Sequence, residues 1–151
     1  MYWQIIDKGD RRALALADRH YTRQTPGSNQ FCRPGRNLVL LGQDAKALWV
    51  TWSGIRDDGW EAWECTIYRN ESPYLSSHLI TLAIGITSRE WGAPPPDGLI
   101  TYLGKHLRGG CFHAAGFRSA GRSKSGKELL QLTADRWPPP LEAYEPQQRL
   151  F

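Results

Sequence analysis

The stretch WEAWECTIYRNESPYLSSHLITLAIGITSREW, residues 60–91, predicts a strand, a turn and a long helix in succession. Its first ten residues alternate between apolar and polar side chains, and this pattern places Trp63, Cys65 and Ile67 on one face of the strand. Residues 76–91 are apolar on almost every side, which is typical of a helix packed against a sheet. A strand that leads into a packed helix favours an α/β domain.

Shorter elements flank this stretch on both sides. The sequence predicts strands over residues 2–6, 37–42, 47–53 and 98–103, helices over 10–20 and 110–115, and a final hairpin of residues 117–122 and 127–132. A polar loop, residues 22–36, precedes the second strand, and loops of that length are often functional. We therefore expect an α/β domain over residues 1–136, with a mixed, mostly antiparallel sheet flanked by helices, and a proline-rich tail over residues 137–151.

The composition of the 151 residues is that of a globular protein, with 40% hydrophobic residues and 17 aromatic ones. This excludes a disordered, fibrous or coiled-coil chain. The three cysteines, Cys32, Cys65 and Cys111, fit no zinc or disulfide pattern, so we expect reduced thiols and no metal site. No apolar run approaches the ~18 residues of a membrane span, and the first residues lack the pattern of a signal peptide. We therefore expect a cytoplasmic protein without a membrane partner.

Basic residues are concentrated in two segments without acidic residues, 19–43 and 98–127. These segments hold ten of the 19 lysines and arginines, so the rest of the chain has nine basic against 15 acidic residues. Arginine outnumbers lysine 14 to 5, which favours paired hydrogen bonds to phosphate or carboxylate. The candidate nucleic-acid contacts are Arg23, Arg33, Arg36, Lys105, Arg108, Arg118, Arg122, Lys124 and Lys127. We expect both segments to face an anionic partner on one side of the fold, and solvated surface is the alternative for either segment.

The order of the predicted elements resembles that of the GNAT acetyltransferases over residues 2–132. The segment FHAAGF, residues 112–117, is similar to the aromatic residue, three-residue spacer and Gly-Phe that end a short helix in that family. The resemblance implies acyl transfer from acetyl-coenzyme A or a related coenzyme A thioester. It places Ser76, Ser77 and Phe112 next to this cofactor, with the pyrophosphate at the N-terminus of the long helix.

Two features depart from the family pattern. The turn at residues 69–77 contains no glycine, whereas the family usually holds the pyrophosphate with a glycine-containing turn. Phe112 takes the position of the family's proton-donating tyrosine and cannot transfer a proton. Tyr102, at the end of a predicted strand, is a candidate replacement or a packing residue. Ser72 or Ser76 is also a candidate cap for the long helix.

A more specific resemblance is to the Mom-type phage proteins, divergent GNAT-fold proteins that modify adenine in DNA by methylcarbamoylation and likewise lack the glycine turn. The similar motifs are His20-Tyr21-Thr22 before the long loop, Tyr68-Arg69-Asn70-Glu71 after the central strand, and Ser76-Ser77 before the long helix. The resemblance implies a phage or prophage origin, with double-stranded DNA and a small-molecule acyl donor as partners. It also implies a reaction centre of His20, Tyr21, Asn70, Glu71 and Ser76.

Each of these residues also has a structural interpretation. His20 is a candidate general base or metal ligand because an imidazole titrates near neutrality, and otherwise it caps the first helix. Tyr21 stacks on a base or belongs to the core. Glu71 acts as a base or forms an ion pair with Arg69, and Asn70 contacts an amide or a base edge.

The first hypothesis is therefore a GNAT-fold transferase that modifies a nucleobase, adenine in the resembling family, in DNA. Two alternatives stay open: an acetyl-coenzyme A-dependent N-acetyltransferase for a small amine or a protein, and a DNA-binding module without catalysis. A hydrolase is disfavoured because Ser76 has no Gly-x-Ser-x-Gly context.

Overall fold

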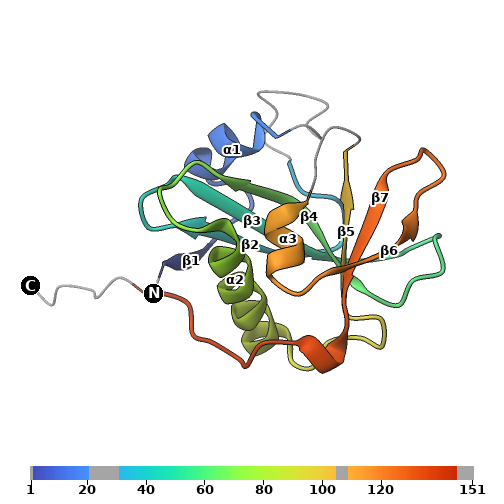
Figure 1. Cartoon of the computed structure of the whole chain (residues 1–151). Coiled ribbons are helices and arrows are strands. Elements are labelled where there is room, and N and C mark those ends of the chain that lie inside the picture. The colour runs from blue at the N-terminus through green and yellow to red at the C-terminus, as the bar shows by residue number, and fades with distance from the viewer. Residues whose placement is uncertain (1, 21–30, 105–108, 146–151) are drawn as a thin grey trace, which may run out of the picture.

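Seven strands in the described part of the chain form one sheet, in the order β1-β2-β3-β4-β5-β7-β6 (Figure 1). The structure is a computed structural model, and it describes residues 2–20, 31–104 and 109–145. The strands are β1 (Trp3–Ile6), β2 (Arg36–Gly42), β3 (Ala47–Ser53), β4 (Trp63–Asn70), β5 (Leu99–Leu103), β6 (Arg118–Arg122) and β7 (Glu128–Leu132). The helices are α1 (Arg11–Ala17), α2 (Ser76–Trp91), α3 (Gly110–Ala114) and the 3-10 helix η1 (Ala134–Arg136). The predicted α/β fold is thus confirmed, and none of these helices is long and apolar enough to cross a membrane.

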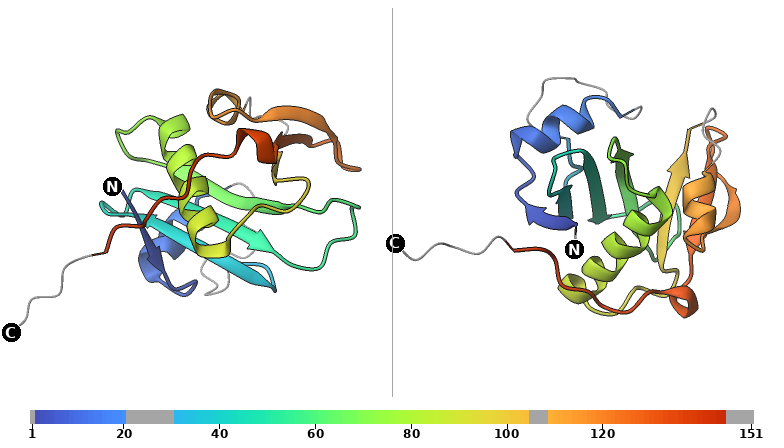
Figure 2. Two further views of the ribbon diagram at one scale, coloured as in Figure 1. Left: turned by 90° about the horizontal axis from the view of Figure 1, so that it is seen from below. Right: turned by 60° about the vertical axis from the view of Figure 1, so that its left-hand side comes forward.

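All neighbouring strands run antiparallel except β4 and β5. These two strands are parallel and pair at only two positions, the second of which joins Glu64 to Ile100. Beyond this pair, residues 65–70 of β4 and residues 101–103 of β5 diverge. We call this point of divergence the fork. It divides the sheet into a half made of β1 to β4 and a half made of β5 to β7 (Figure 2).

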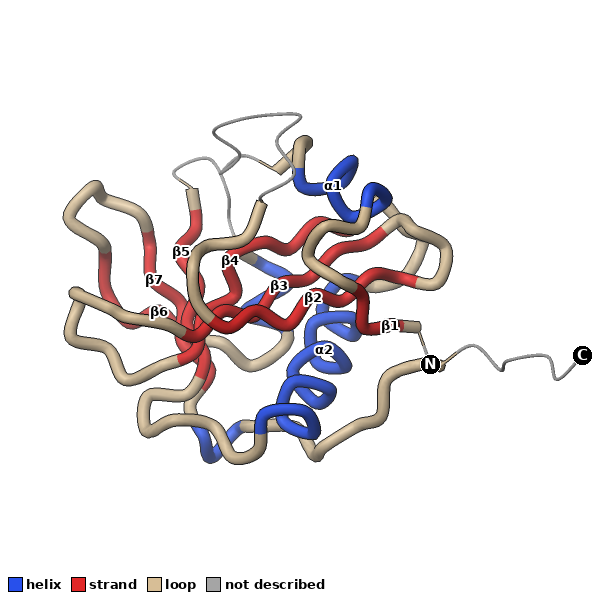
Figure 3. The backbone as a smooth tube through the Cα atoms, turned by 180° about the vertical axis from the view of Figure 1, so that it is seen from behind, coloured by secondary structure: helices blue, strands red, loops and turns tan. Residues whose placement is uncertain are grey.

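Helices cover both faces of the sheet. On one face, Ile80 and Ile84 of α2 belong to the same core as Trp49 of β3. On the other face, Leu16 of α1 belongs to a second core with Val50 of β3. Successive residues of a strand point to opposite faces, so β3 contributes to both cores. Seen from behind, the sheet lies in front of α2, with α1 at one end of the near face (Figure 3).

A bulge in β4 corrects the prediction that Trp63, Cys65 and Ile67 share one face. Two consecutive residues of β3 lie opposite Cys65 and Ile67, so Thr66 between them is an extra residue. An extra residue reverses the alternation of side chains along a strand. Trp63 and Cys65 therefore belong to the core under α2, whereas Ile67 belongs to the core under α1.

The first helix is shorter than predicted. The Asp10 side chain caps its N-terminus by accepting from the Arg12 N–H, and α1 ends at Ala17. Beyond the helix the His20 N–H donates to the carbonyl of Ala17 at 2.9 Å. This turn carries Arg19 and His20 out of the helix towards the end of β4.

The FHAAGF segment adopts the predicted helix end. Gly116 follows α3 with φ of +102°, a left-handed conformation that favours glycine. The Phe117 N–H then donates to the carbonyl of Phe112 at 3.0 Å, and the two rings meet edge to face at 5.2 Å. β6 and β7 follow as the predicted hairpin.

The described part of the proline-rich tail, residues 137–145, lies along α2 (Figures 1 and 2). The Leu141 N–H donates to the carbonyl of Gly85 at 3.0 Å, and the Tyr144 N–H donates to the carbonyl of Trp3 at 2.8 Å. Leu141 also packs against the core under α2. This segment is therefore part of the folded domain.

Candidate functional site at the fork

Aromatic side chains line the α2 side of the fork. Tyr68 of β4 meets Trp49 and Phe112 edge to face, with ring centroids 5.6 and 5.9 Å away. The Tyr68 hydroxyl donates to the carbonyl of Ser76 at 3.2 Å, and burial raises the pKa of Tyr68. Phe112 is buried, so α3 packs against the end of β4 through this ring. The hydroxyl of Tyr68 is therefore protonated, and it lies next to Phe112, whose ring carries no hydroxyl.

The turn between β4 and α2 is held by the side-chain amide of Asn70. Its Nδ2 donates to the carbonyl of Tyr74 and to Ser76 Oγ, both at 2.9 Å. Its Oδ1 accepts the Ser72 N–H at 2.9 Å and the Ser72 hydroxyl at 2.5 Å. The structure thus brings the predicted residues Asn70 and Ser76 into direct contact. A side chain here stabilises a turn that contains no glycine.

The N-terminus of α2 has no side-chain cap. Its N-cap residue is Leu75, so neither of the two serines predicted as candidate caps has that role. The first helical hydrogen bond runs from the Leu79 N–H to the carbonyl of Leu75, and the helix itself leaves the N–H groups of Ser76, Ser77 and His78 without an intrahelical acceptor. Together with the positive end of the helix dipole, these groups can bind an anion.

Glu71 forms an ion pair with two arginines. Its Oε2 accepts from Arg69 Nε at 2.5 Å and from Arg19 Nε at 2.7 Å, and its Oε1 accepts from Arg19 Nη2 at 2.9 Å. These hydrogen bonds lower the pKa of Glu71 to about 2. Of the two interpretations of Glu71, the ion pair is therefore the one observed. A carboxylate with so low a pKa is a poor base at neutral pH.

His20 is half-buried at the same end of β4. Arg69 Nη1 donates to the carbonyl of the preceding Arg19 at 2.8 Å, which attaches this segment to the strand. Burial, and secondly the charge of Arg69, lower the pKa of His20 to about 4. The imidazole is therefore neutral at pH 7. Of the five predicted reaction-centre residues, Asn70 and Ser76 are in direct contact, whereas His20 and Glu71 gather around Arg69. Arg69 lies opposite Leu48 of the core under α1, so the structure shows two separate groups, and Tyr21 lies outside the described residues.

The described basic residues do not gather into one region. Arg33 pairs with Glu64, and the guanidinium of Arg36 lies 4.0 Å from the ring centre of Trp91. Four strands separate β2 from β6 in the sheet, which amounts to roughly 24 Å at about 4.8 Å per spacing. On the β6–β7 hairpin, Arg118, Arg122 and Lys124 are exposed and Lys127 is half-buried. The remaining predicted contacts, Arg23, Lys105 and Arg108, lie outside the described residues.

A buried ion network at the root of the fork was not predicted. The side chain of Glu64 is only 3% exposed and pairs with Arg33 Nη2 at 3.0 Å and Arg56 Nη1 at 2.9 Å. Both guanidiniums also make cation–π contacts with Trp52, at 4.9 Å from its ring centre for Arg33 and 5.3 Å for Arg56. The available signal was a carboxylate between two apolar residues of a predicted core strand.

Two more residues named from the sequence remain: Tyr102, the candidate proton donor, and Cys111, one of the three cysteines expected as reduced thiols. Tyr102 belongs to the opposite face of β5 from Phe112, because its neighbour Leu103 points into the core that contains Phe112. Its hydroxyl donates to Asp58 at 3.0 Å, so Tyr102 does not replace the missing proton donor. Burial raises the pKa of the Cys111 thiol, as expected for an unreactive cysteine.

Comparisons with protein-family models, curated proteins and solved structures found no match to this chain. Among the described residues, no group of three or more His, Cys, Asp or Glu side chains is arranged to hold a metal ion. The function must therefore be inferred from the geometry of the β4–α2 junction and from the charges around it.

Proposed function

We propose that this protein is a GNAT-type transferase that modifies a nucleobase, adenine, in double-stranded DNA with an acyl group carried by a coenzyme A thioester. The observation that carries the proposal is the fork. A single parallel strand pair, joined at only two positions, interrupts an antiparallel sheet, and α2 begins uncapped directly after the first of these strands. This arrangement resembles the one in which GNAT enzymes hold the cofactor.

The β4–α2 junction suits a pyrophosphate. The N–H groups of Ser76, Ser77 and His78 point away from the helix at the positive end of its dipole. Asn70 holds the turn in place of the glycines that the family uses. A bound thioester would supply the acyl group and the leaving thiolate.

When the amino nitrogen of the nucleobase attacks the acyl group, this nitrogen must lose a proton. His20 is the candidate acceptor of that proton because its imidazole is neutral at pH 7, although its pKa of about 4 makes it a weak base in the unliganded protein. Glu71 acts as a positioning residue, because its two arginine partners tie the segment of His20 to the end of β4. Ser76, bound to Asn70, would orient the donor.

The substrate class is argued from charge. Arg118, Arg122 and Lys124 of the β6–β7 hairpin are exposed on the half of the sheet beyond the fork. An exposed basic hairpin favours contacts to a phosphate backbone. These contacts would hold the duplex while a base is turned out of the stack towards the fork.

Mass spectrometry of nucleosides from the DNA of cells that express the protein tests the proposal. The wild-type protein should produce a new acylated nucleoside. His20→Ala and Ser76→Ala should reduce it by at least about tenfold. Glu90→Ala, at an exposed position of α2 outside both proposed binding regions, is the control and should leave the yield unchanged. Absence of a new nucleoside, with soluble folded wild-type protein in the cells, would contradict the proposal.

An N-acetyltransferase for an amine or a protein is the second candidate, favoured by the separation of Arg36 from the β6–β7 hairpin. DNA affinity distinguishes the two. Changing Arg118, Arg122 and Lys124 together to Glu should weaken binding to a DNA duplex. The slope of the logarithm of the binding constant against the logarithm of the salt concentration should become shallower by about 0.9 for each phosphate that the variant no longer neutralises. Changing Lys8, Arg11 and Lys46 together to Glu, all at exposed positions outside the hairpin, is the charge-matched control. Equal effects of both variants, or no DNA binding by the wild type, would favour the acetyltransferase.

A further inference from the structure

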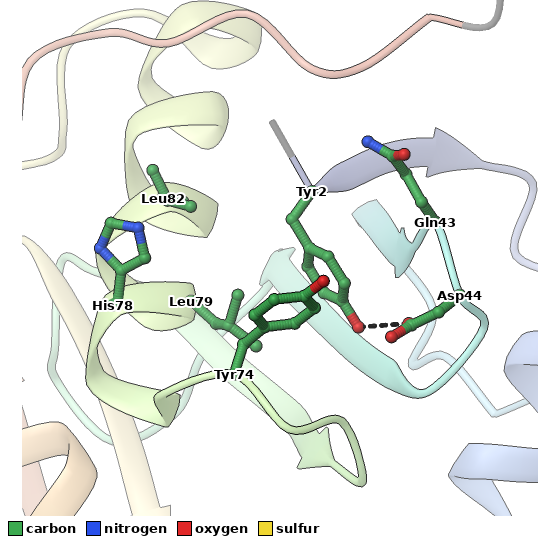
Figure 4. Close-up of a pocket in the computed structure, with 7 residues that line it drawn as sticks. All are labelled: Tyr2, Gln43, Asp44, Tyr74, His78, Leu79 and Leu82. Carbon is green, nitrogen blue, oxygen red and sulfur yellow. Dashed lines mark hydrogen bonds between the residues drawn. The ribbon is translucent and has the colours of Figure 1, made fainter.

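A pocket of about 510 Å³ lies on the β1 side of α2, away from the fork (Figure 4). Its walls come from the start of β1, the turn between β2 and β3, and the first turns of α2. Pockets of this size bind small molecules in many proteins. The proposed transfer reaction uses none of the side chains that line it, so the pocket needs its own explanation.

Two tyrosines form the aromatic wall of the pocket. The rings of Tyr2 and Tyr74 meet edge to face, with centroids 5.1 Å apart and planes at 64° (Figure 4). Tyr74 is 55% exposed, so part of its ring remains open to a ligand. Burial, and secondly the hydrogen bond to Asp44, raise the pKa of Tyr2, which keeps its hydroxyl protonated. The wall is therefore aromatic and uncharged.

Asp44 supplies a fixed negative charge at one end of the pocket. Its Oδ1 accepts the Tyr2 hydroxyl at 2.5 Å and the Lys46 N–H at 3.0 Å. Among the described contacts both hydrogen bonds fall on Oδ1, which leaves Oδ2 for a ligand. The described lining contains no lysine or arginine, and its one potentially cationic side chain, His78, comes from α2 rather than from the turn that carries Asp44. This disfavours a phosphate or a carboxylate as ligand and favours a cation.

The other end of the pocket is apolar. Leu79 and Leu82 of α2 form its floor. A second hollow of about 160 Å³ shares Tyr2 and Leu82 and continues along α2 to Ile86. His78 also lines both hollows and Glu142 lines the second, so the aliphatic surface of Leu79, Leu82 and Ile86 is bordered by polar groups, among them carboxylates at the two ends.

We propose that this pocket binds a small organic cation, an ammonium or guanidinium group on an aliphatic chain. The charged head lies against the rings of Tyr2 and Tyr74 and donates a hydrogen bond to Asp44. Aromatic faces attract cations, and a hydrogen bond between two charged groups is among the strongest that proteins make. The aliphatic chain packs along Leu79 and Leu82. The pocket adjoins the proposed pyrophosphate site at His78 but uses different side chains, so ligand binding to it can be tested without any transferase activity.

Titration of the full-length protein, followed by NMR, tests the site with four probes of similar shape. Butylguanidinium and butylammonium should shift the signals of Tyr2, Tyr74 and Leu82. Butanol and butyrate should bind at least about tenfold more weakly, because they lack the positive head. Equal binding of butyrate, or shifts confined to other parts of the protein, would overturn the proposal.

Variants test the contributions of the Asp44 carboxylate and of the aromatic wall to binding separately. Asp44→Asn keeps an oxygen for Tyr2 and Lys46, so the turn should stay folded, but affinity for butylguanidinium should fall about tenfold. Tyr74→Ala should lower it several-fold, and Tyr74→Phe should preserve it, because the ring face makes the contact. Asp57→Asn, an exposed acid in the loop between β3 and β4, is the charge-matched control.

Two outcomes of these experiments count against the proposal. Unchanged affinity in Asp44→Asn would show that the carboxylate does not contact the cation. A capped Ala-Arg-Ala peptide that binds at least about tenfold more tightly than butylguanidinium would assign the pocket to a side chain of a protein partner. That result would overturn its assignment to a small molecule.

Discussion

At the scale of single residues, the neighbours of a titratable group decide its charge. Half-buried His20 lies near the guanidinium of Arg69, and its pKa falls to about 4 in the folded protein. In the unfolded chain an imidazole titrates near ~6.5. Between these two values the unfolded state binds more protons than the folded state, so lowering the pH through this range favours unfolding.

His20→Gln should therefore change how stability depends on pH. From pH 6.5 to pH 4 we expect the wild type to lose about 2 kcal/mol more of its free energy of unfolding than the variant loses. Urea unfolding at several pH values measures this difference. His78→Gln, at an exposed position of α2, is the control. Parallel pH profiles for the wild type and His20→Gln would show that the imidazole is not held neutral.

Asn70 has a comparable role for the turn between β4 and α2. Asn70→Asp preserves the shape of the side chain but removes the Nδ2 donor that Tyr74 and Ser76 accept. We expect the free energy of unfolding to fall by about 1–3 kcal/mol and amide exchange in residues 72–77 to accelerate. Denaturant unfolding and hydrogen exchange measure the two effects. A variant as stable and as protected as the wild type would mean that the amide does not hold the turn.

At the scale of elements, α2 has the predicted bounds, but its packing depends on a distant segment. A Cβ atom on Gly85 would lie 2.8 Å from the carbonyl oxygen of Pro139 and 3.2 Å from Leu141 Cβ. The helix therefore needs glycine here, although alanine would favour the helical conformation by about 1 kcal/mol.

Gly85→Ala should displace residues 137–145 from α2. We expect cleavage in this segment to become several-fold faster in limited proteolysis, because Pro139 belongs to the backbone that must move. Glu90→Ala, on the exposed side of α2, tests for a general effect of alanine in the helix. If both variants are cleaved as slowly as the wild type, the segment does not depend on the glycine.

At the scale of the whole molecule, the network of Glu64 holds parts of the chain that are far apart in sequence. Arg33 and Arg56 reach this buried carboxylate from two different loops, at the root of the fork. Removing one partner of a buried ion pair leaves an uncompensated charge, whereas replacing the pair by apolar side chains is often nearly neutral.

Glu64→Gln should therefore destabilise the protein by about 1–3 kcal/mol, since it removes one of the two carboxylates that pair with the nearly buried Arg56 and leaves Asp58 as the other. The double variant Glu64→Met with Arg56→Met should recover at least half of this loss. Chemical denaturation of the wild type and the two variants measures both effects. A single variant as stable as the wild type would mean that the network contributes little to the fold.

Local patterns in the sequence were sufficient for most of the elements. The periodicity of residues 76–91 predicted α2, and the two runs at residues 117–122 and 127–132 predicted the β6–β7 hairpin. Helix and hairpin propensities act between near neighbours, so they can be read without the fold. The same patterns could not show the bulge at Thr66, because a bulge exists only in the register between two strands.

The short motifs predicted the region of the candidate site, but they did not predict the interactions between its side chains. Asn70 contacts Ser76, as the short motifs suggested, while Glu71 and the segment of His20 are joined through Arg19 and Arg69 instead. Whether Glu71 is free or paired depends on Arg19, which is 52 residues away. The charge pattern likewise predicted one basic side, while the strand order puts β2 and β6 in different halves of the sheet.

The amino-acid sequence by itself determined the α/β class, the bounds of α2 and the density of positive charge, because each depends on composition or on local periodicity. Only the tertiary structure decided the fork, the burial of Glu64, the neutral state of His20 and the pocket at Tyr2 and Asp44. These features arise from strand order and from contacts between distant residues, and desolvation and hydrogen bonding act only once those contacts have formed.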